Sequence, residues 1–136
     1  MTAELAALAA ALLVQVGALA IYATVANLEL GPRITLSPRD GALPDFSPLL
    51  GRLQRTVANG FESLTLFAPA VALVALTGTA SPVTAFAAWV HVALRVLYIP
   101  AYAYGWVPAR SIIWGLGLFA TLTLIGAALV RAFILA

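Results

Sequence analysis

The placement of the charged residues constrains this chain more than any other feature. The stretches 5–28, 63–94 and 111–130 contain no Asp, Glu, Lys or Arg, and charged residues make up only 9% of the 136 residues. Hydrophobic residues make up 63%, and the mean hydropathy is +1.04. A soluble domain of this size has too much surface for its volume to bury so much apolar side chain. The sequence therefore predicts an integral membrane protein.

Four membrane-spanning helices account for the uncharged stretches. A helix needs about 20 mostly apolar residues to cross the hydrocarbon core. The middle stretch is longer and contains a turn signal at Gly78–Pro82, so it divides into two spans. These two spans reach full length only if Glu62 and Arg95 lie inside the membrane. The predicted spans are about 5–27, 57–77, 83–104 and 111–131.

The predicted fold is all-α: a single four-helix membrane domain over residues 1–136. A polar loop at about 28–56 is rich in Pro and Gly and joins the first two spans. The side of the membrane that holds this loop carries Arg33, Arg39, Arg52, Arg55 and Arg110. The opposite side carries only Arg131. The positive-inside rule therefore places the Arg-rich loops in the cytoplasm and both termini on the opposite side.

The second and third spans each carry a stripe of polar residues at helical spacing. The first stripe is Arg52, Arg55, Asn59 and Glu62, and the second is His91, Arg95, Tyr98 and Tyr102. A charge near mid-membrane costs about 2.5–3.5 kcal/mol on insertion scales, so such residues indicate a functional site. The alternative is a structural ion pair between Glu62 and Arg95 that clamps the two helices together.

The composition disfavours metal and nucleic-acid chemistry. The chain has one His and no Cys, so we expect His91 to be a hydrogen-bonded packing residue and we expect no metal site. The seven basic residues are scattered arginines, too few for a nucleic-acid surface. A transporter is also disfavoured, because the polar cluster does not continue to the other side of the membrane.

Both stripes resemble signatures of the MAPEG proteins, the membrane-associated proteins in eicosanoid and glutathione metabolism. The motif similar to the family's second helix is Arg52-x-x-Arg55-x-x-x-Asn59-x-x-Glu62. The motif similar to its third helix is Arg95-x-x-Tyr98-x-x-x-Tyr102. Arg110 resembles the arginine that catalytic members place beside the glutathione sulfur. The size of the chain, its four predicted spans and its long first loop also agree with the family, so the resemblance covers essentially the whole chain.

The resemblance implies a homotrimer that binds glutathione, as co-substrate, between neighbouring subunits near the cytoplasmic face. The implied glutathione pocket consists of Arg55, Asn59, Glu62, Arg95, Tyr98 and Tyr102. Arg110 is the implied catalytic residue, a fixed cation that stabilises the glutathione thiolate. The thiolate would attack a lipophilic small molecule from the bilayer, held between the first and fourth spans of adjoining subunits.

Two functions remain open at this stage. One is a membrane glutathione-dependent transferase or peroxidase that acts on hydrophobic electrophiles. The other is a non-catalytic MAPEG-like membrane protein that binds a lipid or a partner protein. The chain resembles the small, bacterial-type members of the family, and this resemblance implies a location in a bacterial inner membrane.

Overall fold

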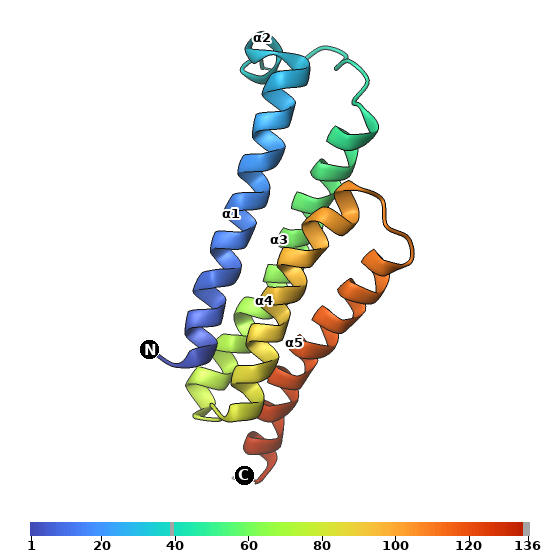
Figure 1. Cartoon of the computed structure of the whole chain (residues 1–136). Coiled ribbons are helices and arrows are strands. Elements are labelled where there is room, and N and C mark those ends of the chain that lie inside the picture. The colour runs from blue at the N-terminus through green and yellow to red at the C-terminus, as the bar shows by residue number, and fades with distance from the viewer. Residues whose placement is uncertain (39, 135–136) are drawn as a thin grey trace.

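Four long helices form the computed structural model, which describes residues 1–38 and 40–134 (Figure 1). They are α1 (Ala3–Leu30), α3 (Pro48–Thr77), α4 (Pro82–Ala103) and α5 (Ala109–Ile134), and one short helix, α2 (Pro32–Thr35), follows α1. Within the described ranges there is no strand. All four long helices are long and apolar enough to cross a membrane, so the predicted all-α membrane fold is confirmed. Arg39, one of the predicted cytoplasmic arginines, lies outside the described residues.

The starts of α3 and α4 share a Ser-Pro signal. The hydroxyl oxygens of Ser47 and Ser81 accept hydrogen bonds from the backbone N–H groups of Leu50 (3.0 Å) and Thr84 (3.2 Å). In both helices Pro occupies the first turn, where its missing N–H costs nothing. α3 ends at Thr77 and is followed by Gly78, whose φ of 65° lies in the left-handed region that glycine adopts most readily.

The loop between the first two spans is shorter than the predicted range 28–56. α1 continues to Leu30, and α3 already begins at Pro48. The Ser-Pro capping signal starts the helix early, and the Pro and Gly content of the segment does not prevent it. As a result, Arg52 and Arg55 lie on α3 itself, in line with the rest of the polar stripe.

The helices form one bundle in which α1 and α5 lie at opposite edges, with α3 and α4 between them (Figure 1). Small residues such as Ala7, Ala11 and Ala88 pack with Phe67 and Leu124 in the core. Small side chains let helix backbones approach closely. The resulting van der Waals contacts hold the helices together in lipid, where the hydrophobic effect does not drive their association. Both termini lie at one end of the bundle, and the α1–α3 and α4–α5 connections lie at the other (Figure 1).

A buried carboxylate joins the helices at the end that holds the termini. Glu4 is only 2% exposed and accepts a hydrogen bond of 2.6 Å from the Thr84 hydroxyl. Its carboxylate therefore lies near the N-terminus of α4, where negative charge is favourable. The contact fixes α1 against α4 far from the polar stripes.

Candidate functional site

The two polar stripes face each other across α3 and α4. Arg95 Nη1 donates a hydrogen bond of 3.0 Å to Asn59 Oδ1, and Arg55 Nε donates one of 3.2 Å to the Tyr102 hydroxyl. The guanidinium carbon of Arg95 lies 4.5 Å from the centroid of the Tyr98 ring. The packing of α3 against α4 thus brings together the two predicted stripes, near the loop end of the bundle.

Arg110 reaches the same place from α5. Its guanidinium carbon lies 4.9 Å from the centroid of the Tyr102 ring, and that of Arg55 lies 5.9 Å from the same centroid. Both distances fall within the range of cation–π attraction. Arg110 also lies in the first turn of α5, where the helix dipole disfavours a cation. This concentration of positive charge favours an anion beside Tyr102.

An open pocket of about 470 Å³ lies between these groups. Its lining residues are Asn59, Tyr98, Tyr102, Arg110, Ser111, Trp114 and Gly115. Ligand pockets commonly measure about 300–1,000 Å³, so this one has room for a small peptide-like molecule. Arg55 and Arg95 do not line the pocket, but each contacts a residue that does, through the bonds to Tyr102 and Asn59.

The ion pair between Glu62 and Arg95, the structural alternative that the sequence left open, does not form within the single chain. Arg95 bonds instead to Asn59, one helical turn nearer the loop end. Glu62 is exposed on the surface of the chain, and among the residues that the structure describes no side chain pairs with its carboxylate. The relative register of α3 and α4 therefore puts a neutral amide, and not the carboxylate, opposite the guanidinium.

Arg52 has a structural position at the edge of the site. Its Nη1 donates a hydrogen bond of 3.3 Å to the carbonyl oxygen of Ala103, at the end of α4. A Cβ atom on Gly105 would come within 3.2 Å of the Arg52 guanidinium carbon. Carbonyl groups at a helix C-terminus need donors, and a cation is favourable there. Arg52 therefore ties α3 to the α4–α5 turn.

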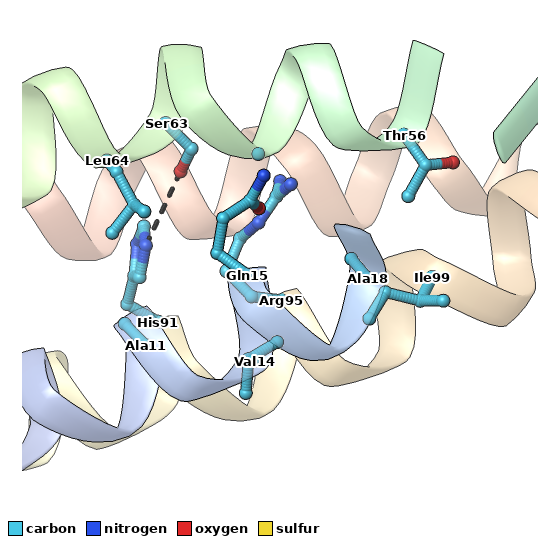
Figure 2. A pocket seen from close by; sticks show the side chains of 11 residues that line it. Ala11, Val14, Gln15, Ala18, Thr56, Ser63, Leu64, His91, Arg95 and Ile99 are labelled. Atoms are coloured by element: carbon cyan, nitrogen blue, oxygen red, sulfur yellow. Dashed lines mark hydrogen bonds between the residues drawn. The ribbon is translucent and has the colours of Figure 1, made fainter. Parts of the chain in front are cut away.

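His91 lies deeper in the bundle and is fully enclosed. It is 1% exposed and stacks on Phe67, with ring centroids 3.9 Å apart. Its Nδ1 lies 3.1 Å from the Gly117 carbonyl oxygen, which can only accept, so Nδ1 carries the proton. Nε2 therefore accepts the hydrogen bond of 3.4 Å from the Ser63 hydroxyl (Figure 2). The predicted role of His91 as a hydrogen-bonded packing residue is confirmed.

Gln15 of α1 joins this region, and the sequence analysis did not identify it. It is 7% exposed, and its Nε2 donates a hydrogen bond of 2.9 Å to the Val57 carbonyl oxygen. Its amide lies against Gly60, where a Cβ atom would overlap it. Gln15 and Arg95 line a small cavity of about 10 Å³, room for about one water molecule (Figure 2). An amide in an otherwise apolar stretch of the first span is the signal that could have indicated this contact.

Comparison with known protein families gives a match that covers nearly the whole bundle. The model of the MAPEG family matches residues 3–130, which include α1, α3, α4 and most of α5. The match also covers every residue of the predicted glutathione pocket. Neither the curated proteins nor the solved structures give a match.

Proposed function

The chain belongs to the MAPEG family, and we propose that it is a glutathione-dependent transferase or peroxidase that acts on lipophilic compounds from the bilayer. The observation that carries this proposal is the open pocket lined by Asn59, Tyr98, Tyr102 and Arg110. Three helices contribute these residues. A purely structural cluster would be expected to close on itself, whereas this one leaves charged and hydrogen-bonding groups beside open space.

The charges around the pocket complement those of glutathione, which carries two carboxylates and one ammonium group. Arg55, Arg95 and Arg110 each keep N–H donors beyond the contacts described above, and guanidinium groups bind carboxylates through paired hydrogen bonds. Glu62 supplies a carboxylate for the ammonium group. Asn59 and the two tyrosine hydroxyls can bond the peptide groups of the ligand.

In the proposed mechanism Arg110 acts as a fixed cation. A guanidinium group cannot accept a proton at neutral pH, so Arg110 is not a general base. A free thiol has a pKa of about 8.5, and a neighbouring cation lowers it. Arg110 would thus stabilise the glutathione sulfur as a thiolate, and the thiol proton would pass to water. The thiolate then attacks an electrophilic carbon, whose bond to the leaving group breaks as the leaving group departs with its electron pair. With a hydroperoxide it attacks the terminal oxygen and the O–O bond breaks, which gives an alcohol after protonation and a sulfenic acid of glutathione that a second glutathione reduces, forming the disulfide and water.

We further propose that the site is completed by a second copy of the chain, in a homotrimer. Glu62 is exposed on the single chain although it lies on a helix that crosses the membrane. A carboxylate facing lipid is costly, which favours burial of this surface against another copy. The Arg-rich loops would face the cytoplasm of a bacterial inner membrane, with the termini on the other side.

Calorimetric titration of glutathione into the detergent-solubilised protein tests the proposal. Tyr102→Leu should weaken binding about tenfold, because Tyr102 contacts both Arg55 and Arg110. Tyr104→Leu makes the same change at a residue that is 69% exposed and does not line the pocket, so it should bind like the wild type. A folded wild-type protein that does not bind glutathione would contradict the proposal and favour the non-catalytic membrane protein.

A further inference from the structure

The small cavity of about 10 Å³ lies where α1 meets α3 and α4 (Figure 2). Its polar side chains are Gln15, Thr56, Ser63, His91 and Arg95, and alanine and aliphatic side chains complete the wall. A cavity of about this volume can hold one water molecule, provided that about two to four polar groups bond the water. The polar lining supplies such groups from three helices.

The Gln15 amide offers a hydrogen-bond acceptor to this cavity. Its Nε2 donates to the Val57 carbonyl oxygen at 2.9 Å, which occupies the donor end of the amide. Its Oε1 lies instead against Gly60, a residue of the cavity wall. Among the residues that the structure describes, no group donates a hydrogen bond to Oε1. Because Gln15 is only 7% exposed and buried polar atoms are hydrogen-bonded, the partner of Oε1 has to lie inside the bundle.

Ser63 and Arg95 provide the other two polar partners. The Ser63 hydroxyl donates its hydrogen to His91 Nε2, so its oxygen can still accept a hydrogen bond. Arg95 has several N–H donors, and one of them bonds Asn59 Oδ1. A water molecule in the cavity can therefore accept from Arg95 and donate to Gln15 Oε1 and Ser63 Oγ. These bonds amount to about three, the usual number for a buried water.

Arg95 lines two spaces. Besides the small cavity, it lines a pocket of about 180 Å³ between α3 and α5, together with Glu62 and Trp114. Trp114 also lines the open pocket in which we place glutathione. The Arg95 side chain thus lies between the water-sized cavity and the space available to the ligand. A contact that fixes Arg95 from the side of α1 therefore also fixes the donors that it presents to the ligand.

We propose that the small cavity binds one water molecule, and that Gln15 and this water together position the Arg95 guanidinium for a carboxylate of glutathione. The second part rests on the proposed function. A buried cation needs hydrogen-bond partners on each side, because the membrane interior supplies none. The water bonds the donors that face α1, and the ligand carboxylate bonds those that face the pocket. Gln15 is a positioning residue, because it acts through Arg95.

The water site can be tested without glutathione. A density map of the ligand-free protein, at a resolution that shows ordered water, should contain one water molecule among Gln15, Ser63 and Arg95. Gln15→Met has a side chain of the same length without the amide, and it should lack both the water and the bond from Arg95 to Asn59. Ala18→Val, which adds methyl groups to the cavity wall and keeps Gln15, is a second variant with the same expected result. A cavity without density in the wild type, or an unchanged Arg95 in the variants, would overturn the inference.

Glutathione titration measures the positioning role. Gln15→Met should raise the Kd about fivefold, the factor that corresponds to one hydrogen bond. Gln54→Met is the matched control, because it makes the same change at an exposed residue outside the cavity. Thr84→Val removes a buried hydrogen bond to Glu4 at the other end of the bundle. Both controls should bind like the wild type, and equal losses of affinity in Gln15→Met and Thr84→Val would refute the positioning role.

Glutathione analogues with one carboxylate converted to an amide identify the group that Arg95 bonds. For one of the two analogues, the wild type and Gln15→Met should have equal Kd values, because the carboxylate that Arg95 would bond is already missing. An undiminished difference for both analogues would contradict the positioning role. A protein that contains the water, loses the Arg95 contact in Gln15→Met and does not bind glutathione would retain the water site and refute the proposed function instead.

Discussion

Two polar regions of the same bundle differ in whether their side chains find partners within the chain. Around His91 each side chain finds a partner inside the chain: Ser63, Gly117 and Thr121 surround the imidazole, and Phe67 covers its face. Around Arg110 the groups instead line an open pocket. In the first region the polar groups hold helices together. In the second they border open space.

The difference shows why position on a stripe does not by itself reveal a role. His91 and Tyr102 belong to the same stripe of α4, and their spacing is equally regular. The two residues differ in their neighbours from α3 and α5. These neighbours enclose His91, whereas Tyr102 lies beside Arg55 and Arg110 at an open pocket. The following substitutions test whether the two regions act separately.

The largest effect on folding is expected at His91. His91→Phe keeps the ring stacked near Phe67 but removes the partner of Ser63 and one partner of the Gly117 carbonyl. The Gly117 carbonyl keeps the Thr121 hydroxyl as a partner, whereas Ser63 loses its side-chain partner. Loss of a partner costs a buried polar group about 1–3 kcal/mol, so the free energy of unfolding in detergent should fall by about 3 kcal/mol, the upper end of that range, because two groups are affected. Glutathione affinity should remain unchanged. A large loss of affinity in the folded variant would contradict the separation of the two regions.

A smaller loss of stability is expected at Gly60. Gly60→Ala places a methyl group where the Gln15 amide lies, and such overpacking costs about 1–3 kcal/mol. Chemical unfolding should therefore show a loss of about 2 kcal/mol. Gly126→Ala is the matched control, because nothing lies within 4 Å of the added atom there. If Gln15→Ala does not relieve the effect of Gly60→Ala in the double variant, the Gln15 contact is not its cause.

The smallest effect is expected at Arg52, on the boundary between the regions. Arg52→Ala removes one hydrogen bond to the end of α4, which is worth about 1 kcal/mol. Thermal unfolding should show this modest loss, and the glutathione KM should change less than it does in Tyr102→Leu. Equal changes in KM for the two variants would mean that Arg52 belongs to the binding site.

Much of the architecture could be predicted from the sequence, because length and hydropathy determine how many helices can cross a membrane. α3 begins before the predicted span of about 57–77, because the capping signal of Ser47 and Pro48 lies within the Pro- and Gly-rich segment. The sequence could not decide whether Glu62 pairs with Arg95, because helical spacing does not determine the register between two helices. One turn, about 5.4 Å, decides which residue lies opposite Arg95. Gln15 stands out in the sequence as an amide in an apolar span, but its partner could not be predicted, because that partner is a backbone carbonyl.

The central claim, that Arg110 holds a glutathione thiolate in the open pocket, is tested most directly by ultraviolet absorbance of the thiolate during glutathione titration. The wild type and Arg131→Ala, a control at the far end of α5, should both give a saturable signal at neutral pH. Arg110→Ala should bind glutathione but lose the signal, because the thiol pKa returns toward about 8.5 without the cation. A saturable signal of full size in Arg110→Ala would contradict the account.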